Sequence, residues 1–389
     1  NPPGSSFGGL KLWGSSGKLS FTTETSIYAK TYMSPNILIF MTDQQRGDVI
    51  LDDAFNRALT PRLDKFRKQG LTFSRAFCPS PHCCPSRATF FTGQYPSRHG
   101  VWNNVNVGNA LSREPYPGVD FWSETLSNSG YQMGFSGKWH ISDFEGPEAK
   151  GWECSYLTAA PCHPRHSGPV LREWEIYKNL ENFSPETLSQ RQPGEIIRPG
   201  YPRHFHYGIQ ENPFGDEDVV TAGIQQLTEH AKGDQPWCQF IGTLGPHDPY
   251  RVPKKFLNLY SPADIELPPS YGDTMADKPV LYRKTRRVFD QLSEDEHKET
   301  IRHYLAFCSY EDHLFGRVLD ALDETGQSDN TLVIFLSDHG DYMGEHGLWS
   351  KGLPAFLSAY HIPAVVRWPD QIVDPAREVK SLVSLADFS

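Results

Sequence analysis

Four short apolar runs, separated by longer segments with helical periodicity, constrain the fold of this chain most strongly. Each run has the length and side-chain content of a buried strand. The runs cover residues 36–41, 131–136, 239–244 and 331–336. Helices are predicted between them, over residues 61–70, 120–130, 217–231 and 296–326. This alternation predicts an α/β fold with a mostly parallel sheet that is flanked by helices on both faces.

Polar side chains suited to catalysis follow each of the four runs. In open parallel sheets, ligands bind beyond the carboxyl ends of the strands, so groups that follow different strands meet at one edge. The residues expected at this edge are Asp43, Gln44, Lys138, His140, His247, Asp338 and His339. A single Asp or His after a strand is more often a helix cap, but four strand ends at once favour a common site.

Two kinds of ligand chemistry are present at this predicted edge. One subset offers two carboxylates, an amide oxygen and an imidazole, which suits Ca²⁺ or Mn²⁺ better than a structural zinc ion. Its members are Asp43, Gln44, Asp338 and His339. A second subset carries donors that could surround an anion, and its members are Lys138, His140, His247 and Lys351.

The composition excludes several classes of protein. Lys and Arg total 37 against 47 Asp and Glu, and the net charge of -10 argues against a nucleic-acid partner. An anionic substrate therefore needs a local positive pocket. Apolar residues make up 38% and charged residues 22%, as in a globular protein. No stretch approaches the roughly 18 apolar residues of a membrane span.

The segment around Cys83 carries the most specific signal in the chain. Pro85 near a helix start and Gly93 as a stop predict a helix with Cys83 at its N-terminus. Free amide groups and the helix dipole favour an anion there and lower the pKa of a thiol. A zinc cluster of neighbouring cysteines is disfavoured, because Cys83 and Cys84 lack the usual two-residue gap. An ordinary catalytic thiolate with a His partner stays open on the residues alone.

The motif around Cys83 resembles the signature of the sulfatase family, relatives of alkaline phosphatase. The matching residues are Cys83-x-Pro85-Ser86-Arg87, Thr92-Gly93, Pro96 and His99-Gly100. Further blocks resemble the family in the family's order: Gly137-Lys138-Trp139-His140, Pro246-His247-x-Pro249-Tyr250, Ser337-Asp338-His339-Gly340-Asp341, Gly344-Glu345-His346-Gly347 and Arg367-Trp368-Pro369. The resemblance spans nearly all of the chain from Pro35 onward. It implies an alkaline-phosphatase-like fold whose smaller C-terminal subdomain is absent or truncated here.

The resemblance also implies a cofactor and a modified residue. The first cysteine of the motif, which is Cys83 here, is oxidised to formylglycine by a formylglycine-generating enzyme. The implied metal ligands are Asp43, Gln44, Asp338 and His339, and the usual ion is calcium. Gln44 and His339 stand where many members have Asp and Asn. This Gln and His version also resembles phosphonate monoester hydrolases, which often favour manganese.

A mechanism for sulfate ester hydrolysis follows from these assignments. Hydrated formylglycine supplies the nucleophile, held by the metal and by Arg87. Lys138 and Lys351 stabilise the charge that develops on the sulfuryl and leaving oxygens. His247 is the predicted acid for the leaving group, and His140 is the predicted base that helps to release sulfate.

The predicted substrate is a sulfated carbohydrate, which is the commonest class in the family. Residues 155–215 are predicted to form a loop-rich insert near the active site, with charged and aromatic side chains that could read a sulfated sugar. The candidates in this insert are His163, Arg165, His166, Arg172, Trp174, His204 and His206. Two alternatives are a phosphonate monoester or phosphodiester hydrolase with the same nucleophile, and a noncatalytic sulfated-glycan binder if Cys83 is unmodified.

The remaining predictions concern the domains and the compartment. Residues 1–34 are predicted to be an N-terminal extension, and residues 35–389 a sulfatase catalytic domain. The seven cysteines exclude complete pairing, although Cys154 and Cys162 could form a disulfide in an oxidising compartment. The periplasm, the cell exterior or the lysosome is therefore predicted rather than the cytoplasm.

Overall fold

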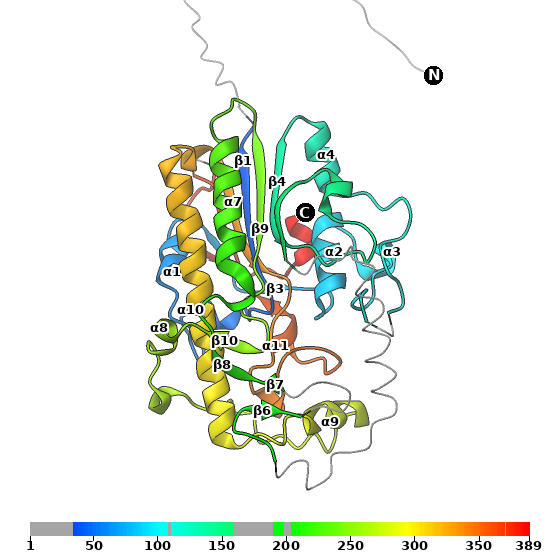
Figure 1. The fold of residues 1–389 in the computed structure, drawn as a ribbon, viewed down its shortest axis with the longest axis vertical. Coiled ribbons are helices and arrows are strands. Elements are labelled where there is room, and N and C mark those ends of the chain that lie inside the picture. Colours follow the sequence, from blue (N-terminus) through cyan, green and yellow to red (C-terminus); the bar gives the residue numbers. More distant parts are fainter. Residues whose placement is uncertain (1–33, 108–109, 159–189, 198–203, 370) are drawn as a thin grey trace, which may run out of the picture. The chain divides into compact units, whose positions relative to one another are not determined.

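A central sheet of eight strands organises the computed structural model, which describes residues 34–107, 110–158, 190–197, 204–369 and 371–389 (Figure 1). Residues 35–389 form one compact unit. In spatial order the strands are β14 (Arg377–Val379), β2 (Leu71–Phe73), β13 (Ala364–Arg367), β11 (Thr331–Ser337), β1 (Asn36–Thr42), β9 (Trp237–Gly242), β4 (Gln132–Lys138) and β5 (Glu153–Thr158). The five strands from β11 to β5 run parallel, whereas β13 pairs antiparallel with both β11 and β2.

The four predicted strands are confirmed as β1, β4, β9 and β11, the core of the parallel sheet. Smaller pairings lie outside it: β3 (Ala76–Phe77) between β12 (His361–Ile362) and β15 (Val383–Ser384), β6 (Glu195–Ile196) with β7 (His204–Phe205), and β8 (Tyr207–Ile209) with β10 (Tyr250–Val252). The edge strand β5 extends into the segment predicted as loop. Its sequence gave no strand signal because most of its side chains are polar and only partly buried.

Helices cover both faces of the sheet, as predicted. The helices are α1 (Pro61–Arg67), α2 (Cys83–Thr92), α3 (Pro96–His99), α4 (Trp122–Asn128), α7 (Asp216–His230), α8 (Lys254–Leu257), α9 (Val280–Arg287), α10 (Glu294–Glu324) and α11 (Leu357–Tyr360). Short 3-10 turns occur at Asp48–Ile50, Pro147–Lys150, Pro213–Gly215, Pro262–Asp264, Ser328–Asn330, Glu345–Gly347 and Leu385–Phe388. In the described part of the chain, every helix is too short or too polar to cross a membrane.

Two apolar clusters hold the layers together. Alternate residues of β1 point to opposite faces of the sheet, as the pleat of a strand requires. Leu38 and Phe40 join the cluster under α1, α7 and α10, whereas Ile39 and Met41 join the cluster under α2 and α4. Figure 1 shows α7 and α10 on one side of β1 and β9, and α2 and α4 on the other. The strand ends are thereby held rigidly between two helical layers.

The longest helix, α10, begins with a capping box. The hydroxyl of Ser293 accepts a hydrogen bond from the amide of Glu296 at 3.3 Å, and the Glu296 carboxylate accepts one from the Ser293 amide at 2.7 Å. These bonds satisfy amide groups that the first turn of a helix leaves unpaired. The predicted helix over 296–326 is therefore confirmed, with its start two residues earlier.

Candidate active site

The ends of β1 and β11 bring two aspartates together. The two strands run parallel with Thr42 opposite Ser337, so Asp43 and Asp338 emerge side by side. The amide of Gln44 donates a hydrogen bond to Oδ1 of Asp338 at 3.2 Å. Both carboxylates are fully buried. The prediction that these strand ends converge at one edge of the sheet is confirmed.

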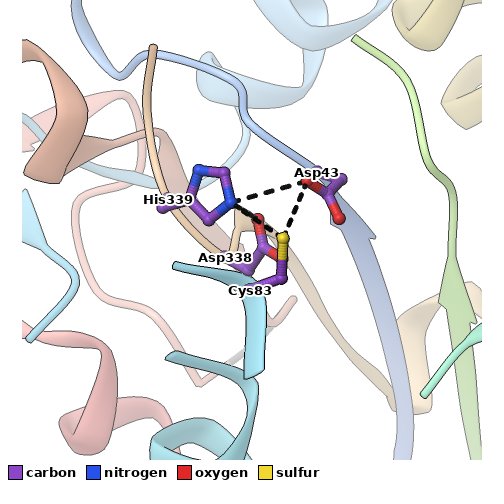
Figure 2. A group of neighbouring side chains, drawn as sticks. All are labelled: Asp43, Cys83, Asp338 and His339. Atoms are coloured by element: carbon purple, nitrogen blue, oxygen red, sulfur yellow. Dashed lines mark hydrogen bonds and ion pairs between the residues drawn. The ribbon is translucent and has the colours of Figure 1, made fainter. Parts of the chain in front are cut away.

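A cluster of four possible metal ligands forms at this edge (Figure 2). The ligand atoms of Asp43, Cys83, Asp338 and His339 all lie within 4.8 Å of one another. Nε2 of His339 is 3.3 Å from Sγ of Cys83 and 3.6 Å from Oδ1 of Asp43. The other ring nitrogen, Nδ1, donates to the Gly340 carbonyl at 2.9 Å. This bond leaves Nε2 as the ring nitrogen that faces the cluster.

The cluster fits a divalent cation. Burial and repulsion from Asp43 raise the pKa of the Asp338 carboxyl above its ordinary value. Two carboxylates and an imidazole around one point are the donors that bind such an ion, and the ion relieves their repulsion. The cluster contains neither Cys78 nor Cys84, so the described residues give no support to a zinc cluster of adjacent cysteines.

Cys83 is the first residue of α2, as the sequence predicts. Gly93 ends the helix with a φ of 65° in the left-handed region, which glycine adopts without strain. Burial would raise the pKa of the Cys83 thiol, but Lys138, Lys351 and His339 hold that pKa well below its ordinary value. The site therefore favours an anion at the position of the Cys83 sulfur.

Arg87 lies one turn further along α2 and is fully buried. Its guanidinium donates to Oδ2 of Asp338 at 2.8 Å, to the Lys138 carbonyl at 2.8 Å and to Oδ2 of Asp43 at 3.4 Å. These three bonds engage both carboxylates and the end of β4. The sequence analysis predicted that Arg87 holds the nucleophile. In the structure, the contacts of the Arg87 guanidinium hold the two aspartates in place.

Lys138 is the last residue of β4, and its ammonium group contacts Oδ2 of Asp43. Burial would raise the pKa of the Asp43 carboxyl, as would the Cys83 charge. The positive charges of Lys138, His247 and Arg87 outweigh both effects and hold that pKa below its ordinary value. Asp43 is thus kept as an anion inside the protein, which a metal ligand requires.

Gln44 has its amide group held in one orientation. Its nitrogen Nε2 donates to Oδ2 of Asp341, and also faces Oδ1 of Asp248 at 3.3 Å and the Tyr250 hydroxyl at 3.4 Å. The oxygen Oε1 therefore points the other way, where it accepts a hydrogen bond from Nζ of Lys351 at 2.5 Å. An amide oxygen fixed in this direction suits the predicted ligand role.

Two histidines lie beside the cluster with defined ring orientations. Nδ1 of His247 donates to the Asp248 carbonyl at 2.6 Å, and its Nε2 contacts the Lys351 ammonium group. Nε2 of His140 pairs with Oδ1 of Asn106 at 3.2 Å, while its Nδ1 is buried without a hydrogen-bond partner. The structure thus brings all ten predicted site residues into one region, linked through Asp43, Cys83, Lys138 and Lys351.

Three further residues support the site but were not predicted for it. Asp341 accepts from Gln44, from the Tyr250 hydroxyl at 2.6 Å and from the Met343 amide at 2.7 Å. Burial raises the pKa of the Asp341 carboxyl to about 6. Asp341 and Tyr250 belong to sequence blocks that already carry predicted site residues. Their places in these blocks could therefore have indicated that they belong to the site. Asn106 has no such signal.

Among the candidate sugar-binding residues, only His206 has a side chain that the structure describes. His206 is fully buried, with its ring 4.9 Å from that of Tyr250 and 5.3 Å from that of Trp349. The interpretation of His206 as a substrate contact is wrong, because it packs among aromatic rings in the interior. The side chain of His204 and residues 159–189, which contain Cys162 and the other five candidates, lie outside the described residues.

The fold and the site together define a class of α/β proteins in which a helix-terminal cysteine faces a cation site at the ends of parallel strands. The model of the sulfatase family matches residues 35–389, and the chain belongs to this family. The predicted family and its fold are thereby confirmed.

Three known proteins illustrate the similarity. Choline-sulfatase of Rhizobium meliloti (strain 1021) is 30% identical over 353 residues, which cover 86% of this chain and 63% of that protein. An ulvan-active sulfatase of Formosa agariphila is 25% identical, over 86% of this chain and 56% of that protein. The crystal structure of a phosphonate monoester hydrolase of Agrobacterium radiobacter has a TM-score of 0.68 at 24% identity, covering 91% of this chain and 72% of that one, which shows the shared fold.

Proposed function

We propose that this chain is the catalytic part of a sulfatase that hydrolyses a sulfate ester of a carbohydrate. The observation that carries the proposal is the buried cluster of Asp43, Cys83, Asp338 and His339 at the N-terminus of α2. The Cys83 sulfur stands where an oxygen of hydrated formylglycine would lie after maturation. Family membership and the named activities of the relatives support this proposal.

The metal ion would be held by the two aspartates, His339 and the fixed Oε1 of Gln44. It would act as a Lewis acid that polarises oxygens of the sulfate group. Calcium is the first choice, and manganese is the alternative. Arg87 would keep both aspartates in place through the bonds described above, so that the ligand geometry is set before the ion binds.

Formylglycine formed from Cys83 would supply a geminal diol with one hydroxyl as the nucleophile. The basic side chains around it would bind and orient the sulfate. Lys138 and Lys351 both lower the pKa of the Cys83 thiol, which indicates that they act on a negative group there. The same two ammonium groups would stabilise the charge that grows during attack at sulfur.

His247 and His140 would move protons on opposite sides of the reaction. The contact between Lys351 and Nε2 of His247 gives a route by which a proton reaches that nitrogen and then the leaving oxygen. The His140 ring contributes to lowering the pKa of the Cys83 thiol, so it lies beside the nucleophile position. It is therefore placed to accept the proton of the second hydroxyl as sulfate leaves.

Removal of the His247 imidazole is expected to slow hydrolysis in proportion to how poor the leaving group is. For His247→Ala we expect kcat/KM to fall by about 10² to 10⁴ on a sugar sulfate, whose alcohol needs a proton. A far smaller loss is expected on nitrophenyl sulfate, whose phenolate leaves without one. Steady-state kinetics on both substrates measure the difference. Equal losses on the two substrates would remove His247 from the acid role.

A second candidate function is phosphonate monoester or phosphodiester hydrolysis by the same site. It is favoured by Gln44 and His339, which resemble the ligands of phosphonate monoester hydrolases. Turnover of nitrophenyl sulfate and of a nitrophenyl phosphonate monoester, each assayed with calcium and with manganese, separates the two functions. Higher kcat/KM on the phosphonate with either ion would replace the sulfatase assignment.

The mass of the tryptic peptide over residues 76–87 tests the proposal directly. Alkylation blocks the thiols of Cys78 and Cys84, whereas formylglycine does not react in this way. We expect one alkylation fewer than the three cysteines allow, together with the mass loss of thiol-to-aldehyde conversion. An active preparation in which all three thiols are alkylated contradicts the mechanism, whereas an inactive preparation of that kind supports a noncatalytic glycan binder.

The proposed partners and compartment follow from this maturation step. A formylglycine-generating enzyme would have to act on Cys83 before the chain folds, because the Cys83 side chain is 1% exposed in the folded protein. We propose maturation on an exported chain, with the periplasm, the cell exterior or the lysosome as the final compartment.

A further inference from the structure

Two buried carboxyl groups lie behind the active site and take no part in the proposed mechanism. Asp216 is the first residue of α7, Glu311 lies in the middle of α10, and both are 0% exposed. Asp216 accepts hydrogen bonds from two consecutive amides, at 2.9 Å from Leu244 and at 2.8 Å from Gly245. These amides belong to the loop that follows β9 and leads to His247.

Glu311 packs against the same loop. A Cβ atom added to Gly245 would lie 2.0 Å from Oε1 of Glu311 and 2.4 Å from a ring carbon of Phe307, so a larger residue would force these side chains to move. The neighbouring Asp216 side chain acts on the Glu311 carboxyl, and neither Glu311 oxygen accepts a hydrogen bond from a donor among the described residues. On its other side, the Gly245 carbonyl accepts a hydrogen bond from the Asp43 amide at 3.0 Å. The two acids thus hold a loop that connects Asp43 with His247.

No Lys or Arg in the described part of the chain forms an ion pair with either carboxyl group. Lys138 contacts Asp43, and Arg317 contacts Glu217 and, at 3.1 Å, the hydroxyl of Thr221. Among the described residues, the titratable and charged groups that interact with the pair include Asp43 after β1, Lys138 from β4, Glu217 from α7, and Cys308 and Tyr310 from α10. Two ionised carboxylates buried together in these surroundings would be strongly unfavourable.

We propose that Asp216 and Glu311 form a carboxylate and carboxylic acid pair that shares one proton, and that this pair positions the loop between β9 and His247. Asp216 is the charged member, because both of its oxygens accept amide hydrogen bonds. Glu311 is the acid, and its hydroxyl donates to Asp216. Both are positioning residues. The loop-positioning half of the inference rests on the proposed function, whereas the shared proton does not.

The pH dependence of stability has a definite sign. Burial, followed by the neighbouring Asp216, raises the pKa of Glu311 well above its ordinary value of 4.5, and burial raises the pKa of Asp216 to about 7. A carboxyl whose pKa is higher in the folded than in the unfolded state contributes its full stability below the unfolded pKa. That contribution is lost as the pH rises toward the folded pKa.

The Glu311→Gln variant keeps the shape of the protonated side chain but cannot lose a proton, because its amide can donate to Asp216 at every pH. It therefore isolates the effect of the proton on stability. We expect the folding equilibrium constant of the wild type, relative to Glu311→Gln, to fall by up to about tenfold per pH unit above pH 5. Chemical denaturation at pH 5 to 9 measures it. Other titrating groups, including the metal ligands, contribute equally to both proteins and drop out of the ratio.

Glu217→Gln is the matched control, since Glu217 is partly exposed and paired with Arg317. Its stability relative to the wild type should be nearly independent of pH over this range. Infrared difference spectra add a second readout: the carbonyl band of a neutral carboxylic acid should be present at pH 7 in the wild type and weaker in Glu311→Gln. A pH-independent ratio of wild type to Glu311→Gln, with no such band, would overturn the shared proton.

The positioning half is tested with Asp216→Asn, which places an amide NH₂ group against one of the two loop amides. We expect kcat/KM on a sugar sulfate to fall at least tenfold, mainly through kcat, while the control Glu217→Gln stays close to the wild type. Wild-type kinetics from Asp216→Asn would overturn the positioning role. If the wild type itself hydrolyses no sulfate ester, the proposed function fails, and the denaturation and infrared results still decide the shared proton.

Discussion

Replacement of Cys83 with alanine is expected to lower kcat/KM for sulfate ester hydrolysis by about four to six orders of magnitude. The variant keeps the metal ligands and the basic side chains but loses the only group proposed to attack sulfur. Knockouts of a nucleophile in other hydrolases produce losses of this size, with the rest of the site retaining a small residual activity. Kinetics with nitrophenyl sulfate on purified, metal-loaded protein measure the effect.

Cys84→Ala is the matched control for this experiment. Cys84 is also fully buried, burial raises the pKa of its thiol above the ordinary value, and its sulfur accepts a hydrogen bond from the Val105 amide at 3.3 Å. It is not a member of the metal-ligand cluster. Activity should therefore survive in Cys84→Ala, and comparable losses in both variants would point to a folding defect instead of a missing nucleophile.

Removal of the Arg87 guanidinium is expected to cost about 3–5 kcal/mol of unfolding free energy. Arg87→Met leaves Asp43 and Asp338 buried without the cation that bridges them, and an uncompensated buried charge has a cost of this size. Denaturant unfolding without added metal gives the value. Calcium should restore part of the loss, since the ion can partly replace the missing positive charge between the two carboxylates.

Arg57→Met serves as the control for Arg87. Arg57 pairs with Asp64 at 2.7 Å, but both side chains are partly exposed, and a pair of this kind contributes about 0–1 kcal/mol. A loss for Arg87→Met no larger than that for Arg57→Met would show that the aspartates do not depend on the guanidinium. The comparison thus separates a buried bridging charge from an ordinary surface ion pair.

Buried negative charge is offset in two different ways in this region of the protein, by the proposed cofactor at one place and by the proposed pair at Asp216 and Glu311 at the other. At Asp43 and Asp338, Arg87, Lys138 and a bound cation offset the buried negative charge. At Asp216 and Glu311, no Lys or Arg among the described residues forms an ion pair, and a proton takes that part. The Asp43 amide and the Asp216 carboxylate both contact the loop after β9. We therefore expect changes at Asp216 or Glu311 to alter the position of His247 through the backbone of that loop.

The amino-acid sequence by itself predicted the four central strands of the sheet and the ten residues that gather at its edge. Strand runs have a local signature of short apolar segments, and parallel strands send their following residues to one edge, so Asp43, Lys138, His247 and Asp338 were predictable together. In the Cys83 motif, Pro85 predicted the start of the helix and Gly93 predicted its end. The family followed from these blocks in order, without any knowledge of distances.

Only the tertiary structure decided how these groups pair. The bonds of Arg87 to both aspartates, the amide orientation of Gln44 and the contact between His247 and Lys351 join residues far apart in the chain, and no local pattern encodes them. The same holds for Asp216 and Glu311, which are buried together and have no ion-paired Lys or Arg in the described part of the chain. His206 shows the converse, because a polar residue in a loop-like segment is drawn into an aromatic core. Burial and long-range pairing are properties of the packed fold, which is why sequence patterns reached the ligands but not their partners.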